Sequence, residues 1–297
     1  MSYTAIDLSQ LPAPTVVETL DYETILTAML TDLQQRDPVF NALIESDPVY
    51  KILEVAAYRE TIIRARVNDS ARAVMLAYAT GSDLGQLGAL FNVERKLLTP
   101  GNPTANPPTD PVWESDEEFR RRIQLSLEGL SVAGPEGAYI YHALSVDPRA
   151  LDATATSPKA GEVLVTVLSR EGDGSAPPDL VSAVEKHLQQ DELRPMTDAV
   201  TVQGVTVIKY QVSATLYTYP GPDRAVVLAE ARIQLANYVE AMRRLDKDVP
   251  VSGIFAALHV EGVQRVQLES PAADLIISPV QAGYCDAITI TDGGEAF

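Results

Sequence analysis

A proline-rich segment divides this chain of 297 residues and limits how it can fold. The stretch LLTPGNPTANPPTDPVWESDEEF contains Pro100, Pro103, Pro107, Pro108 and Pro111. Proline has no backbone N–H and a fixed φ, so we expect neither a helix nor a strand to run through this stretch. The sequence therefore predicts an ordered or semi-rigid linker over residues 98–113, with different kinds of structure on its two sides.

Before the linker, apolar residues at helical spacing predict a helical strut over residues 22–97. A first helix runs from Tyr22 to a stop at Asp37 and Pro38. A second has Asp47 as its N-cap and Pro48 at its first position, and its apolar stripe continues to residue 79, about 45 to 50 Å along the axis. Residues 1–21, which contain two prolines, are expected to form an extended N-terminal arm that lies on another surface, for example on a neighbouring subunit.

The glycines of YATGSDLGQLGALFNVER raise the alternative of a phosphate-binding loop. Such a loop needs a strand that leads into the glycines, whereas here a long helix precedes them and no lysine follows. We interpret the stretch as a helix corner. Gly81 fits the left-handed position after a helix, and Ser82 fits the N-cap of the next one.

Acidic residues after the linker, Glu114 and Asp116 to Glu118, invite a catalytic or metal-binding interpretation. A capping box explains them better. Ser115 is followed three residues later by Glu118, and acids stabilise the positive end of a helix whose buried face includes Phe119.

The remaining two thirds of the chain predict an α+β fold, with small domains in series over residues 114–205 and 206–297 and antiparallel or mixed sheets. The predicted helices cover residues 136–148, 178–190, 223–245 and 252–260, the last with Ser252 as cap. The predicted strands cover residues 161–169, 263–268, 274–278 and 287–291, and residues 197–219 are predicted to form one or two long strands. A change in the alternation near Ile208 and Lys209 predicts a bulge or bend there.

Charge and composition argue against several kinds of partner. The net charge of −18 repels nucleic acid and anionic lipid headgroups, so neither nucleic acid nor a membrane is an expected partner. No apolar run reaches the length of a membrane span, and the start MSYTAIDLSQLPAP lacks the features of a secretory signal. We therefore expect the protein to stay in the cytoplasm where it is made or to leave by a non-secretory route.

The residues give no positive indication of catalysis. His142, His187 and His259 are far apart and lack a second ligand at helical spacing, and Cys285 is a lone cysteine at the end of an apolar run. The chain shows no nucleophile elbow, no zinc-binding helix motif and no calcium loop. We predict no catalytic, cofactor-binding or metal-binding residues, no cofactor, and no enzymatic activity.

An ordered series of motifs resembles the baseplate J-like proteins of contractile phage tails. In chain order they are ATGSDLGQLGALFNVER, the proline-rich linker, ESDEEFRRRI, GPEGAYIYHALSVDP, GEVLVTVLSREG and LRPMTDAVTV. Each motif is loose because it consists of caps, turns and apolar periodicity, but their order is specific. The resemblance covers residues 50 to 285 approximately.

This resemblance implies a structural wedge protein of a tail baseplate. Family members assemble with a smaller wedge protein through a helical bundle of their N-terminal portions, with two copies per wedge expected, and six wedges form a ring around the central hub and spike. The other expected partner is the sheath-initiating baseplate protein. The ring opens on receptor contact and triggers sheath contraction, which is a switch between two subunit packings. The location implied is the baseplate of a phage or bacteriocin particle assembled in the bacterial cytoplasm.

We accordingly expect residues 22–97 to form the wedge bundle and the C-terminal domains to form the ring contacts. Apolar residues that look surplus to a monomer core, such as Ile62 beside Ile63 and Leu97 beside Leu98, are then interface residues. Two alternatives stay open at this point. One is a cell-wall hydrolase of the tail tip, and the other is a fibre or receptor-binding module, although the chain lacks the repeats typical of fibres.

Overall fold

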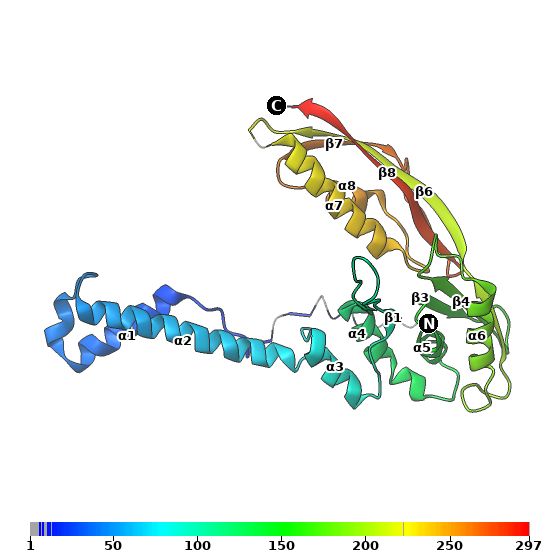
Figure 1. Ribbon diagram of the computed structural model, residues 1–297, viewed down its shortest axis with the longest axis horizontal. Coiled ribbons are helices and arrows are strands. Elements are labelled where there is room, and N and C mark those ends of the chain that lie inside the picture. The colour runs from blue at the N-terminus through cyan, green and yellow to red at the C-terminus, as the bar shows by residue number, and fades with distance from the viewer. Residues whose placement is uncertain (1–5, 7, 9–10, 13, 222, 297) are drawn as a thin grey trace. The chain divides into compact units, whose positions relative to one another are not determined.

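The computed structural model describes residues 6, 8, 11–12, 14–221 and 223–296, and these form two compact units. Of the described residues, the helical unit contains those from 6 to 95 together with Glu114–Arg121, and the mixed unit contains Lys96–Trp113 and those from Arg122 onward. Helices dominate the first unit, whereas the second holds three small antiparallel or mixed sheets, as Figure 1 shows. This confirms the predicted α+β class. Of the predicted N-terminal arm, residues 1–5, 7, 9–10 and 13 lie outside the described residues.

The helical unit begins with a hairpin of two helices, α1 (Tyr22–Arg36) and α2 (Pro48–Ala73), joined through the 3-10 helix η2 (Pro38–Ala42). Asp21 caps α1 by accepting a hydrogen bond from the Glu23 N–H at 3.2 Å. Asp47 stands at the N-cap of α2 as predicted, but its carboxylate accepts from the Ile44 N–H instead of a helical one. The described residues 14–20 lie along the C-terminal part of α2, where Glu18 bonds Asn68 (Figure 1).

Helix α2 ends at Ala73, so the prediction of a continuous helix to residue 79 is wrong. After Ala73 the backbone turns more tightly than an α-helix, since the Met75 N–H donates to Arg72 O and the Tyr78 N–H donates to Met75 O, both at 3.0 Å. Arg120 donates to Leu76 O at 2.6 Å and to Ala79 O at 2.7 Å. These bonds fold residues 74–79 into a compact turn that buries Ala79 completely.

The glycine-rich stretch forms the predicted helix corner, with α3 (Gly81–Leu90) following the turn. Gly81 has a φ of +53°, the left-handed conformation that favours glycine, but the N-cap is Thr80, so the prediction of Ser82 there is wrong. Asp116 accepts from the Gly81 N–H at 3.1 Å and pairs with Arg95. Burial alone would raise the pKa of Asp116, but the hydrogen bonds from Arg95 and Gly81 outweigh burial and lower it.

Asp116 also begins α4 (Asp116–Leu125), where Glu118 N–H donates to Ser115 Oγ at 3.3 Å. This bond is one half of the predicted capping box. The acids after the linker thus cap a helix and fix the corner, and α4 passes from the helical unit into the mixed unit between Arg121 and Arg122.

Two glycines of α3 provide a matched test of this corner. A Cβ on Gly88 would lie 2.5 Å from the Phe119 ring and 2.7 Å from Val93 O, whereas a Cβ on Gly85 would meet nothing within 4 Å. We expect Gly88→Ala to destabilise the protein by about 1 to 3 kcal/mol because the backbone oxygen cannot move aside cheaply. Gly85→Ala should be neutral or stabilising by up to about 1 kcal/mol. Urea unfolding followed by circular dichroism measures both, and equal effects would contradict this packing.

The proline-rich linker is a hairpin, which corrects the prediction that it contains no strand. Strands β1 (Leu97–Thr99) and β2 (Val112–Trp113) pair antiparallel. The prolines lie between the strands and not in their paired positions, which is why a short ladder survives.

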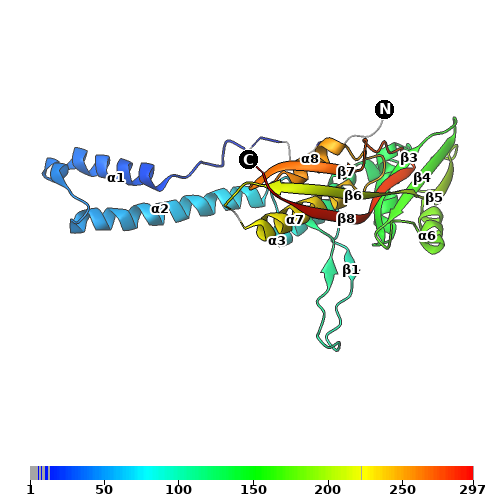
Figure 2. The same ribbon diagram turned by 90° about the horizontal axis from the view of Figure 1, so that it is seen from above.

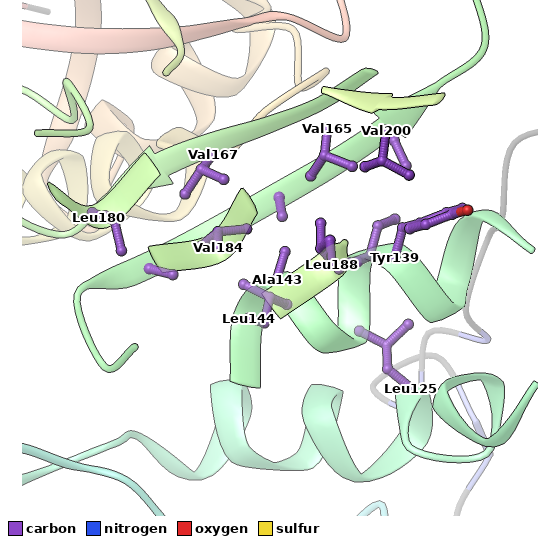
Figure 3. Packing of buried hydrophobic residues seen from close by; sticks show 14 residues of the cluster. Leu125, Tyr139, Ala143, Leu144, Val165, Val167, Leu180, Val184, Leu188 and Val200 are labelled. Carbon is purple, nitrogen blue, oxygen red and sulfur yellow. The ribbon is translucent and has the colours of Figure 1, made fainter. Parts of the chain in front are cut away.

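The first part of the mixed unit, the central domain, contains η3 (Glu128–Leu130), α5 (Glu136–Val146), β3 (Ala150–Thr156), β4 (Glu162–Ser169), α6 (Pro178–Leu188) and β5 (Ala199–Gly204). Its sheet has the order β3-β4-β5, antiparallel and then parallel. Figure 3 shows the core, in which Val165 and Val167 of the sheet face Ala143 and Leu188 of the helices. Strand β3 was not predicted.

The C-terminal domain begins one residue after the central sheet ends. It contains β6 (Thr206–Thr218), α7 (Arg224–Met242), α8 (Val251–Leu258), β7 (Val263–Ser270) and β8 (Gln281–Glu295). Its sheet has the order β7-β6-β8, and both helices pack on one face (Figure 1). Of the one or two long strands predicted at 197–219, the structure has two, which lie in two different sheets and are separated by Val205.

Three finer predictions for this domain need correction. Residues 274–278 form no strand but a single bridge, Val249 to Leu275, and Leu275 packs against the core of the domain. The N-cap of α8 is Pro250 and not Ser252, since proline already supplies the extended φ required there. The bulge predicted near Ile208 and Lys209 exists but lies two residues later, between Tyr210 and Gln211, with the extra residue in β8.

Candidate interaction surfaces

The described residues contain no group of three or more His, Cys, Asp or Glu side chains placed to hold a metal ion. Within the same part of the chain, no helix is both long and apolar enough to span a bilayer. Cys285 is half-buried in β8, where burial raises the pKa of its thiol, and this disfavours the reactive thiolate. His259 is exposed at the end of α8.

Two of the three histidines do meet, which their sequence spacing did not reveal. The rings of His142 on α5 and His187 on α6 have centroids 5.5 Å apart because the two helices pack side by side. His142 Nε2 lies 3.1 Å from Gly129 O. Burial lowers the pKa of both imidazoles, and the neighbouring ring of His187 lowers that of His142 further.

This pair predicts a loss of stability in mild acid. An unfolded histidine has a pKa of about 6.5, so below that pH the unfolded chain binds protons that the folded pair resists, and the free energy of unfolding falls. We expect wild type to lose more stability between pH 7.5 and 5.5 than His187→Leu, by up to about 1.4 kcal/mol per pH unit. His259→Leu is the matched control. Parallel pH dependence in all three proteins would contradict this role of the pair.

The helical hairpin buries very little of its own apolar surface. Leu26 is the one buried residue of α1, and Ala57 and Asn68 are the two of α2, both helices being described in full. Asn68 does not pack in a core but clamps the backbone of Glu18, donating to its carbonyl at 2.9 Å and accepting from its N–H at 3.0 Å. A hairpin with so small a core gains little of its stability from its own packing.

Large apolar side chains instead occupy the outer side of α2. Those more than 40% exposed are Ile52, Val55, Tyr58, Ile62, Ile63 and Val67. At 3.6 residues per turn, they fall on the half of the helix that faces away from Ala57 and Asn68. We call these six residues the α2 face. The exposed side chains of Arg59 and Arg66 lie on the same side of the helix, so the face is apolar but interrupted by two arginines. Six large apolar side chains on a helix exposed to solvent are typical of a surface that another protein covers.

A second apolar feature lies between α1 and α2. A groove of about 340 Å³ is lined by residues of both helices, including Ile25, Ala28 and Met29, with Glu60 and Arg64 at its edge. Arg64 is held there by Glu60 at 2.7 Å and by Glu18 at 3.0 Å. The hairpin therefore offers both a groove and an apolar face, as a helix pair in an incomplete bundle does.

The central and C-terminal domains meet through a buried carboxylate. Asp152 of β3 is 2% exposed, and its two oxygens accept from the Leu245 N–H at 3.0 Å and the Ala153 N–H at 2.9 Å. Thr154 Oγ1, on the same strand, donates to Pro279 O at 2.6 Å. Around this point, Leu151 and Leu168 of the central domain pack with Leu245 and Ala282 of the C-terminal domain.

Arg243 completes this junction from the C-terminal side. Its guanidinium stacks over the Tyr284 ring at 5.4 Å and donates to Gly172 O at 3.0 Å and Arg170 O at 3.3 Å. Asp173 in the same loop pairs with Lys209 at 3.0 Å. We call these contacts, with those of Asp152, the domain junction. These contacts join the two domains at several separate points.

A cavity of about 400 Å³ adjoins the domain junction. Two carboxylates line it, Glu136 and Asp246, together with Tyr139. Burial and repulsion by Asp248 raise the pKa of Asp246, which has a φ of +55°. The backbone on both sides of this turn is hydrogen-bonded, with the Leu245 N–H donating to Asp152 at 3.0 Å and the Asp246 N–H donating to Gln281 O at 3.3 Å.

Comparison with known proteins gives matches along most of the chain. The models for the baseplate J-like N-terminal, central and C-terminal domains match residues 45–102, 131–204 and 210–291. Baseplate protein J of Escherichia phage P2 is 48% identical over 297 residues, which cover 98% of each chain. Among solved structures, the cryo-EM structure of the anti-feeding prophage (AFP) baseplate is 14% identical, with a TM-score of 0.38 over 60% of this chain and 44% of that chain.

The three matching models follow one another in the same order as the helical part, the central domain and the C-terminal domain. Together with the near full-length relative, they agree with the resemblance found in the sequence motifs. The chain belongs to the baseplate J-like family.

Proposed function

We propose that this protein is a structural, non-enzymatic subunit of the baseplate of a contractile tail. Family membership supports the location, and the α2 face is the observation that carries the structural role. Six large apolar side chains on one exposed helix side would be a liability in a protein that worked alone, but they suit a subunit whose assembly covers them.

The helical unit, on this proposal, is one part of a wedge bundle. The α2 face and the groove beside α1 receive helices from a second copy of the chain and from a smaller wedge protein. Each predicted domain then has its own role. Residues 22–97 form the bundle, and the domains at 114–205 and 206–297 form the contacts between wedges. Two copies per wedge and six wedges would form the ring around the hub and spike, beneath the sheath-initiating protein.

Contraction then requires the ring to change its packing without unfolding its subunits. The domain junction supports the view that the central and C-terminal domains move as one body, because separating them would expose the Asp152 carboxylate contact and four buried apolar side chains. The switch would therefore lie in the contacts between copies. Assembly of these particles would take place in the bacterial cytoplasm, for a phage or for a bacteriocin.

Removal of the helical unit tests the wedge assignment. A chain lacking residues 1–97 is expected not to retain the smaller wedge protein when it is purified by a C-terminal tag from producing cells. The physical reason is the loss of both apolar surfaces of the hairpin. Undiminished retention of that protein would contradict the assignment of residues 22–97 to the bundle.

The cavity beside the domain junction favours one alternative, a cell-wall hydrolase that uses Glu136 and Asp246 as an acid and base pair. The structural proposal expects no clearing of a cell-wall zymogram by the purified chain. Clearing that is lost in Glu136→Gln would establish the hydrolase and overturn the proposal that the protein is not an enzyme.

A further inference from the structure

The hairpin formed by residues 97–113, here called the hairpin arm, is a second surface without a visible partner. Its strands β1 and β2 pair with each other and, in the part of the chain that the structure describes, with no other strand. Figure 2 shows it extending away from the sheets and helices of the mixed unit. A two-stranded hairpin standing alone is marginally stable in water, so its ordered shape needs a reason.

Local hydrogen bonds and prolines supply that order. Asn102 and Thr109 exchange backbone hydrogen bonds at 2.9 and 3.1 Å, and Asn102 Oδ1 accepts from the Thr104 N–H and hydroxyl at 3.0 and 2.7 Å. A Cβ on Gly101 would lie 2.7 Å from Pro111 N, so the two sides of the arm approach closely. Such a pre-organised arm loses little conformational entropy when it binds.

The arm is also firmly attached at its base. The Lys96 ammonium donates to Leu144 O, and to Asp147 O at 3.3 Å, at the C-terminal end of α5. This places the arm in a defined position on the central domain. A rigid arm on a rigid base is suited to reach a neighbouring molecule in one orientation.

Apolar side chains are exposed where the arm meets its base. Trp113 is 51% exposed, Val112 is 52% exposed and Leu97, paired with Trp113, is 39% exposed. Trp113 is the one tryptophan in the sequence. Tryptophan is strongly enriched among the residues that dominate binding energies at protein interfaces.

Charge indicates which partner the arm fits. The whole chain carries a net charge of −18, whereas Asp110 is the only charged residue of 97–113. Two copies of so acidic a protein repel each other, so a contact between copies is favoured where charge is sparse. We propose that the hairpin arm binds a second copy of this chain in the assembled particle and that Trp113 becomes buried in that contact.

This inference rests on the proposed function, which brings several copies together in one ring. A ring that repeats one contact needs that contact to be head-to-tail, so we expect the arm of one copy to meet a different surface on the next. Contacts of this type close into rings when the rotation between neighbours is right.

Site-specific photo-cross-linking in producing cells tests the proposal. Full-length chains carrying Trp113→p-benzoylphenylalanine, or Ile63→p-benzoylphenylalanine as the reference, are irradiated within purified particles. We expect the position 113 product to contain two copies of this 32.1 kDa chain, identified by mass spectrometry. A product with a different protein, or no product while position 63 reacts, would overturn the proposal. Absence of the chain from particles would instead contradict the proposed function, and the arm contact with it.

A pair of substitutions measures the importance of the contact. Trp113→Ser is expected to lower the yield of complete particles at least about tenfold, because it removes the largest apolar side chain of the patch. Tyr219→Ser, at a residue 52% exposed elsewhere in the mixed unit, is the matched control and should leave the yield unchanged. Equal yields from the two variants would contradict a role for Trp113.

Discussion

Ile63→Asp is expected to exclude the chain from tail particles while leaving the isolated protein folded. Ile63 is 64% exposed, so the substitution should change the free energy of unfolding by no more than about 0.5 kcal/mol. In a bundle the same position would be covered. An unpaired carboxylate buried there costs about 3 kcal/mol or more, which lowers the equilibrium constant for incorporation at least about a hundredfold.

The matched control for this experiment is Ile233→Asp on α7, at a residue 54% exposed. Both variants replace an exposed helical isoleucine with aspartate, so they differ only in the surface tested. Tagged chains are expressed in producing cells, and the fraction that sediments with particles is measured beside the circular dichroism spectrum of the purified protein. Loss of incorporation in both variants, or in neither, would contradict the assignment of the α2 face as the bundle surface.

Asp152→Ala should have the largest effect on stability of any single change at the domain junction. The substitution leaves the buried Leu245 N–H without its acceptor and opens a gap beside Leu151 and Leu168. Together these effects are expected to lower the free energy of unfolding by about 2 to 3 kcal/mol. Urea unfolding of the full chain measures the loss.

Asp286→Ala, which removes an exposed carboxylate of β8, is the control and should lie within about 0.5 kcal/mol of wild type. The same unfolding curves also show whether the two domains unfold together, which is expected in wild type because the junction connects their two sheets. In Asp152→Ala the central and C-terminal domains are expected to unfold in more separate steps than in wild type. An unchanged midpoint and unchanged cooperativity would show that the junction does not couple the domains.

Local signals predicted much of the helical unit because caps and corners depend on neighbouring residues. Gly81 required a left-handed conformation, Ser115 and Glu118 formed half of a capping box, and Pro48 began α2 where expected. The end of α2 was missed because the turn that follows it is held by Arg120, more than forty residues away. No periodicity within the helix contains that information.

The features that the sequence did not predict in the mixed unit also depend on contacts between residues far apart in the chain. Strand β3, with the sequence ALDATAT, has weak alternation and a buried aspartate, and it is a strand because it pairs with β4. From the sequence alone, Asp152 would be expected at the surface, whereas in the fold it is buried and joins two domains. The meeting of His142 and His187 likewise depends on how α5 packs against α6.

The apolar stripe on α2 was visible in the sequence, but whether it faced a core was not. Ile62 and Ile63 were singled out as surplus to a monomer core, and the structure leaves both exposed. Periodicity shows that one side of a helix is apolar, and only the fold shows that this side remains uncovered.

The most direct test of the proposed function is to locate the protein in the particles of producing cells. A tagged chain is expressed there, the high-mass fraction is isolated, its partners are identified by mass spectrometry, and the tag is located by labelled negative-stain imaging. We predict rod-shaped particles labelled at one end of the sheath, with a smaller wedge protein and hub proteins present. A chain recovered only as a free monomer, absent from every large assembly, would contradict the structural role.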